Sequence, residues 1–155
     1  MIVTIWIALA LFVAGEYEPG TSRRLPAARL LFLLGALICV AHITLAMSNV
    51  HRWSHAAAIA ATAAQTNAFY GVRWGGGVYV NYVFSAVWIA DALQRLVAPA
   101  SFARRSRALV WTLRAFYFVI IVNAAVIFAA PGRRWMGVVI CVLIAVAWSR
   151  QQEHT

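Results

Sequence analysis

The side chains best suited to bind a ligand are two histidines four positions apart, His51 and His55. On a helix, residues with this spacing share one face, and imidazole nitrogens bind zinc, copper and haem iron. A third histidine, His42, is half a turn out of phase with His51 on a continuous helix, so a turn near Ser48 is needed to bring it round. The three histidines are a candidate site for a metal ion or haem. The alternative is a set of interfacial histidines bonded to water, headgroups and amides.

Other polar side chains are expected at a similar depth, in one layer near the outer end of the apolar segments. They are Gln65, Asn67, Arg73, Tyr79, Asn81, Tyr82 and Asn123. Polar groups inside hydrocarbon are costly, and they usually face the interior of a helical bundle and pair there. The layer would complete a site for a metal ion, haem or quinone. The structural alternative is helix packing through alanines and hydroxyl groups.

One carboxylate, Asp91, lies well inside an apolar run, and an intramembrane carboxylate is a functional hypothesis by default. Arg114 is expected at a similar height on the next, antiparallel helix. We therefore predict an Asp91–Arg114 ion pair that holds the two helices in register. Arg95 is the competing partner, because it follows Asp91 by one helical turn. A proton relay through Asp91 is the functional alternative.

The chain that must position these groups is strongly apolar. Of its 155 residues, 64% are hydrophobic and 11% are charged, whereas about a quarter of the residues of a soluble domain are charged. Five apolar segments approach the length that crosses a bilayer, about 20 residues. They are residues 2–14, 27–47, 78–96, 109–130 and 135–148. Proline, glycine and serine separate them, which is typical of turns and helix caps.

An alanine-rich segment, 54–70, decides the topology. If it lies in the interface or re-enters, and the N-terminus is outside, the arginines of the loops divide eight inside to four outside. The inner set is Arg23, Arg24, Arg29, Arg95, Arg104, Arg105, Arg107 and Arg150, and the outer set is Arg52, Arg73, Arg133 and Arg134. If the segment spans, the division is six to six, and Asp91 rises to the level of His42. The positive-inside rule favours five spans over six, with the C-terminus inside.

The net charge is +9, and all thirteen basic residues are arginine. The arginines form short groups between apolar runs, which indicates topology signals and headgroup contacts and not a nucleic-acid-binding face. An arginine-only basic set is typical of a high-GC bacterium, so we expect the cytoplasmic (inner) membrane. No nucleophile elbow, HExxH motif or Walker sequence is present.

The sequence thus predicts a single transmembrane domain over residues 1–155, an all-α integral membrane protein. Its fold would be a compact bundle of five transmembrane helices with an interfacial or re-entrant alanine-rich helix. The expected partners are the lipid bilayer and other membrane helices, in a homo- or hetero-oligomer, and not nucleic acid. The expected function is a non-catalytic accessory or scaffold component of a membrane assembly. The alternative is a redox protein that binds a metal ion, haem or quinone in the outer polar layer.

Overall fold

The computed structural model describes residues 2–17 and 25–152, and every regular element in these ranges is helical. The elements are α1 (Ile2–Glu16), α2 (Leu25–Asn49), α3 (His55–Tyr70), α4 (Gly77–Val97), α5 (Pro99–Ala103), α6 (Arg107–Val122), the π-helical turn η1 (Asn123–Ile127), the 3-10 turn η2 (Pro131–Arg133) and α7 (Arg134–Gln152). Four of the five apolar segments expected from the sequence each correspond to one helix, and segment 109–130 corresponds to α6 and η1 together; all the ends agree within four residues.

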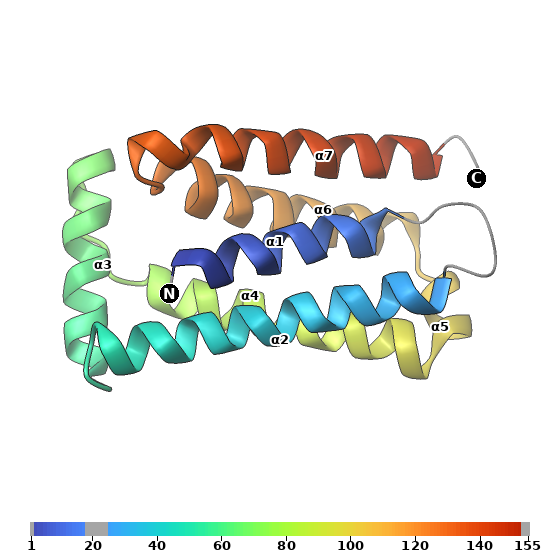
Figure 1. The fold of residues 1–155 in the computed structure, drawn as a ribbon, viewed down its shortest axis with the longest axis horizontal. Coiled ribbons are helices and arrows are strands. Elements are labelled where there is room, and N and C mark those ends of the chain that lie inside the picture. Colours follow the sequence, from blue (N-terminus) through green and yellow to red (C-terminus); the bar gives the residue numbers. More distant parts are fainter. Residues whose placement is uncertain (1, 18–24, 153–155) are drawn as a thin grey trace.

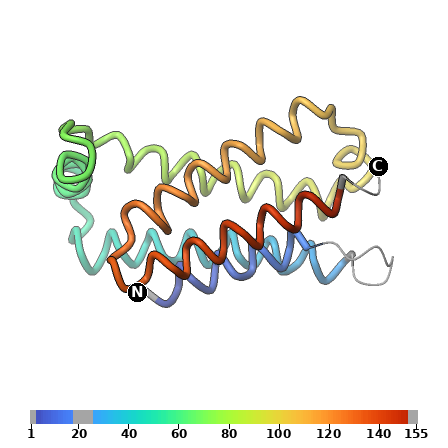
Figure 2. The backbone as a smooth tube through the Cα atoms, turned by 90° about the horizontal axis from the view of Figure 1, so that it is seen from above, coloured from blue at the N-terminus to red at the C-terminus, as the bar shows by residue number. Residues whose placement is uncertain are grey.

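Helices α1, α2, α4, α6 and α7 run along one axis in alternating directions, while α3 lies across one end of the bundle (Figure 1). Short α5 lies at the opposite end. In the perpendicular view α3 is seen almost along its own axis, at the same end of the molecule (Figure 2). The alanine-rich segment therefore does not run alongside the five long helices. We refer below to the α3 end and the α5 end.

Within the described ranges, three helical segments are long and apolar enough to cross a membrane: Pro26–Asn49, Arg107–Ile127 and Pro131–Gln151. Helix α1 is apolar but short. Helix α4 has 21 residues, but polar side chains interrupt its apolar surface. The predicted all-helical membrane class is confirmed at this level, and the number of spans stays a prediction.

Local backbone geometry turns the chain into α3. Arg52 and Trp53 both have positive φ values, 48° and 61°, a conformation that is uncommon for residues other than glycine. The Ser54 side chain then caps α3 by accepting a hydrogen bond from the Ala57 amide at 3.2 Å. Gly71, in the left-handed conformation with φ 71°, ends the helix. These features begin α3 as a new helix with its own direction.

An aromatic cluster fills the centre of the bundle. Phe12, Phe32, Phe84, Trp88 and Tyr117 come from four different long helices, and all are buried. Their neighbouring ring centroids are 5.1–5.9 Å apart in tilted or edge-to-face arrangements, which are the favourable geometries for aromatic pairs. Aromatic side chains thus connect α4 to α6 and α1 to both.

The closest backbone approach that depends on a glycine is between α7 and η1. A Cβ atom on Gly137 would lie 2.1 Å from the Ala125 carbonyl oxygen, so the two segments would have to separate. We expect Gly137→Ala to destabilise the fold by about 1–3 kcal/mol, the usual cost of overpacking. The thermal unfolding midpoint in detergent measures this. Gly132→Ala is the matched control, because a Cβ there meets nothing within 4 Å; an equal loss in both variants would contradict the packing argument.

Candidate functional site

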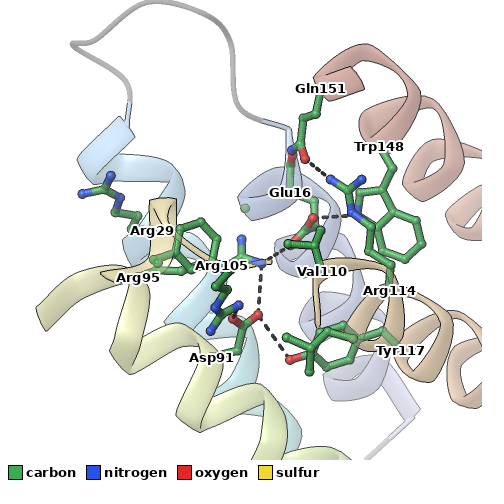
Figure 3. Close-up of a pocket in the computed structure, with 13 residues that line it drawn as sticks. Glu16, Arg29, Asp91, Arg95, Arg105, Val110, Arg114, Tyr117, Trp148 and Gln151 are labelled. Atoms are coloured by element: carbon green, nitrogen blue, oxygen red, sulfur yellow. Dashed lines mark hydrogen bonds and ion pairs between the residues drawn. The ribbon is translucent and has the colours of Figure 1, made fainter. Parts of the chain in front are cut away.

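The most polar part of the interior lies at the α5 end and is centred on Asp91, which is 3% exposed. Its Oδ1 accepts a hydrogen bond from Nη1 of Arg105 at 2.5 Å, and its Oδ2 accepts one from Nη2 of Arg95 at 3.0 Å. The Tyr117 hydroxyl donates to the same Oδ2 at 3.3 Å. Both carboxylate oxygens are therefore bonded, two of the donors being arginines (Figure 3).

A second buried carboxylate, Glu16, ends α1 at the same cluster. Its Oε1 forms an ion pair with Arg95, and its Oε2 accepts a hydrogen bond from the Trp148 indole at 2.6 Å. The Gln151 side chain also donates to the Glu16 carbonyl oxygen at 2.6 Å. Arg95 thus links an acid on α1 to an acid on α4, and α7 supplies two further donors.

Aromatic rings and a short helix hold the arginines in place. The Arg95 guanidinium lies 3.7 Å above the centroid of the Phe32 ring and 4.9 Å from that of Phe102, as in a cation–π contact. Pro99 begins α5, and the chain folds back so that Arg105 reaches α4. There its Nε donates to the Gln94 side-chain oxygen at 3.0 Å. Helix α5 therefore positions Arg105 against Asp91.

The predicted Asp91–Arg114 ion pair is wrong in its partner. Arg114 donates to the Gln151 side-chain oxygen, and none of the ion pairs among the described residues includes it. One helical turn further along α6, Tyr117 occupies the position that faces Asp91. Arg95, the competing partner, does bind the aspartate. Arg114 and Asp91 line the same cavity, but Tyr117 and not Arg114 is the α6 residue that bonds to Asp91.

The cluster encloses a cavity of about 70 Å³. Its lining contains two carboxylates and four guanidinium groups, so the formal charges do not balance. These six ionic side chains are Glu16, Asp91, Arg29, Arg95, Arg105 and Arg114. The remaining lining is mainly aromatic and aliphatic, with Phe102, Tyr117 and Trp148 among it. The geometry is that of a partly buried, positively charged recess at one end of the bundle.

The three histidines lie at the α3 end and are separated. His51 is in the turn before α3 and His55 is the first residue of α3, so the two do not share a helix face. The His55 and Tyr82 rings form a T-shaped pair, with centroids 5.7 Å apart. His42, on α2, shares a hydrogen bond of 2.9 Å with Thr4. Across residues 2–17 and 25–152, no three His, Cys, Asp or Glu side chains are grouped as a metal site would require.

The other members of the predicted polar layer are also dispersed at the α3 end. Asn123 accepts a hydrogen bond from the Tyr70 hydroxyl at 2.9 Å, which joins α6 to α3. Tyr82 is partly buried. The remaining five side chains are exposed: Gln65, Asn67, Arg73, Tyr79 and Asn81. Asp91 lies nine residues after Tyr82, about 13 Å further along α4 at helical rise, so it is not level with the histidines.

Sequence reasoning missed several members of the charged cluster. Glu16 stands at the end of the first apolar run, which is a signal that a buried partner is needed, but nothing in the sequence specifies Arg95 as that partner. Trp148 and Gln151 lie more than 130 positions from Glu16 in the chain. Only the packing of α1 beside α7 brings these groups together (Figure 1).

Comparison with known proteins does not add to this description. No family model, curated protein or solved structure matches the chain. The function must therefore be argued from the geometry of the described residues.

The assignment of partners to Asp91 can be tested by double-mutant cycles. Asp91→Asn should destabilise the protein by about 3–5 kcal/mol, because two arginines lose a buried counter-charge. Combined with Arg105→Gln, it should show a coupling of at least about 1 kcal/mol, since the two side chains touch. Combined with Arg114→Gln, it should be additive within about 0.5 kcal/mol. Free energies of unfolding in detergent measure both cycles; stronger coupling to Arg114 than to Arg105 would reverse the assignment.

Proposed function

We propose that the chain is a multi-pass protein of a bacterial cytoplasmic membrane that acts as a non-catalytic component of a membrane assembly. The observation that carries this proposal is the bonding of the two buried carboxylates. All four oxygens of Glu16 and Asp91 accept hydrogen bonds from arginine, tryptophan or tyrosine side chains. A general acid or base must exchange a proton with its substrate, and these oxygens are already committed to the protein. The cluster is therefore suited to fixing helices and not to acid–base chemistry.

The proposed topology has five spans, with the α3 end outside and the α5 end in the cytosol. Among the described loop and end positions, six arginines lie toward the α5 end and four toward the α3 end. The six are Arg29, Arg95, Arg104, Arg105, Arg107 and Arg150, and the four are Arg52, Arg73, Arg133 and Arg134. Arg23 and Arg24 lie outside the described residues. The excess supports a cytosolic α5 end by the positive-inside rule.

Helix α3 fits a position in the outer interface. It crosses the bundle end instead of running along it (Figure 1). Most of its surface is exposed, and exposed Trp53 and Trp74 flank it. Tryptophan is favoured at the boundary between lipid and water. An interfacial α3 allows α1, α2, α4, α6 and α7 to provide the five spans.

The outer faces of α6 and α7 support a role in an assembly. Only 17% of the apolar window of α6 and 22% of that of α7 are buried within the chain, compared with 28% for α2. Val119 on α6 and Val142 on α7 are more than half exposed. In a membrane such surfaces contact lipid or other helices, whose association depends on close packing. We place the partner helices on the α6–α7 face.

Topology is tested by single cysteines at Arg73 and Ser101, in a background with Cys39→Ala and Cys141→Ala. Both positions are exposed, and they lie at opposite ends of the bundle. A membrane-impermeant maleimide added to intact spheroplasts should label residue 73 and leave residue 101 unlabelled. Permeabilised membranes, in which both positions should react, are the control. Labelling of residue 101 alone in intact cells would contradict the five-span arrangement.

The assembly role is tested by a photo-cross-linking amino acid placed at Val119 or Val142 in native membranes. We expect both positions to give an adduct with the same protein, identified by mass spectrometry. Leu37 on α2 is the control, because it is similarly exposed but belongs to the better-packed helix. Adducts with lipid alone at both test positions, or the same protein adducts at all three positions, would argue against a specific α6–α7 interface.

A further inference from the structure

The geometry points to an oxyanion-binding site in the cavity at the α5 end, which takes a phosphate group, either free or in the headgroup of an anionic lipid. This inference does not depend on the assembly role proposed above; the lipid-headgroup form of it rests on the proposed cytosolic position of the α5 end. It rests on three features of the described residues: uncompensated charge, hydrogen-bond donors with no acceptor, and a recess of suitable size.

The first feature is charge. Arg95 and Arg105 form ion pairs with Glu16 and Asp91, so these four side chains are neutral as a group. Two further arginines line the cavity, Arg29 and Arg114, and neither takes part in an ion pair among the described residues. A partly buried guanidinium is stabilised by a counter-charge. Counted over the described residues alone, the lining of the cavity therefore has a formal charge of +2 with no further carboxylate to balance it.

The second feature is the supply of oriented donors. The Arg114 guanidinium carbon lies 5.6 Å from the centroid of the Trp111 ring and 5.4 Å from that of Trp148, and one of its nitrogens donates to Gln151. These contacts fix the guanidinium while leaving other N–H groups for a ligand, because arginine has five. The Nε of Arg95 is also buried and has no hydrogen-bond acceptor within residues 2–17 and 25–152. Planar guanidinium forks match the spacing of phosphate oxygens.

The third feature is space and position. A cavity of about 70 Å³ admits several water-sized groups, since one water needs about 10–15 Å³ of this kind of volume. Each of the four oxygens of a phosphate group is about as large as a water molecule, so the group fits this volume. Arg29 lies at the edge of the recess, with its side chain pointing away from Asp91 (Figure 3). Arg29 therefore adds positive charge at the edge of the recess, while Arg114 supplies a donor group held within its lining.

The position also fits a lipid headgroup. Basic pockets between transmembrane helices on the cytosolic side are typical sites for anionic headgroups. Arg104 and Arg107 are exposed at the same end and add to the positive potential there. A headgroup would bind from the bilayer surface, whereas inorganic phosphate would enter from water. The two sources share one chemistry, and the experiment below distinguishes them.

The test compares ligand-induced stabilisation of the full chain in neutral detergent. One arm adds inorganic phosphate against sodium chloride of equal ionic strength, and the other adds phosphatidylglycerol against phosphatidylcholine. We expect a rise in the thermal unfolding midpoint with phosphate, with phosphatidylglycerol, or with both, as for any ligand that binds the folded state. A response to phosphate identifies a site open to water, and a response to phosphatidylglycerol alone identifies a headgroup site.

The variants decide whether the cavity is responsible. Arg114→Gln should weaken the apparent affinity by about ten-fold, since it removes charge-assisted bonds, and Arg29→Gln should weaken it by a smaller factor. Arg104→Gln is the matched control, with the same change of charge at an exposed position outside the cavity. If Arg114→Gln does not fold, retention of phosphatidylglycerol by Arg29→Gln and Arg104→Gln in native mass spectrometry gives the same comparison. The inference is overturned if the wild-type protein responds to neither ligand, or if the control loses as much affinity as the cavity variants.

Discussion

The structure depends on one guanidinium group. Arg95 binds Glu16 from α1 and Asp91 from its own helix, and it lies against the face of Phe32 from α2. A carboxylate buried in apolar surroundings is costly unless it is paired and hydrogen-bonded. Both carboxylates bind this one cation, and Asp91 binds Arg105 as well, so Arg95 joins α1, α2 and α4 at the point where they pack together. Removing either acid would leave a buried charge unmatched, which is why the cluster determines how the helices meet.

The two ends of the bundle are held by different forces. At the α5 end, ion pairs and short hydrogen bonds join the helices. At the α3 end the described residues form no ion pair: Tyr70 bonds to Asn123, Phe69 meets Phe128 edge to face with centroids 5.3 Å apart, and the Arg134 guanidinium lies 5.7 Å from the Phe69 centroid. Hydrogen bonds and ring contacts of this kind contribute less to the free energy of unfolding than hydrogen bonds between charged groups, and they tolerate small shifts of the helices. We infer that register between the helices is set at the α5 end, and that α3 adapts to the bundle and does not organise it.

The apolar runs were sufficient to predict where the long helices lie, whereas the composition of 54–70 left its placement open and only the distribution of arginines favoured separating that segment from them. Asp91 was recognised as unusual because a carboxylate in an apolar run needs a partner. Its partner Arg105 was not recognised, because a five-residue helix and a reversed turn bring it there. The pairing of His51 with His55 failed for a similar reason: two residues of positive φ separate them. Helical spacing does not predict which residues share a face across such a turn, and the turn itself is not evident from a single sequence.

The contacts of the cluster explain why arginine suits position 95 and lysine would not. One nitrogen of Arg95 meets oxygens of both Glu16 and Asp91, while the plane of the same group stacks on Phe32. An ammonium group can bridge two oxygens but has no flat face to stack, and it is more strongly hydrated, so burying it costs more. The same argument extends to Arg114, whose position beside two indole rings holds a flat donor group ready at the cavity. A donor that is already oriented loses less entropy when a ligand binds. The indole rings that pack against Arg114 therefore also orient its guanidinium for binding a tetrahedral anion.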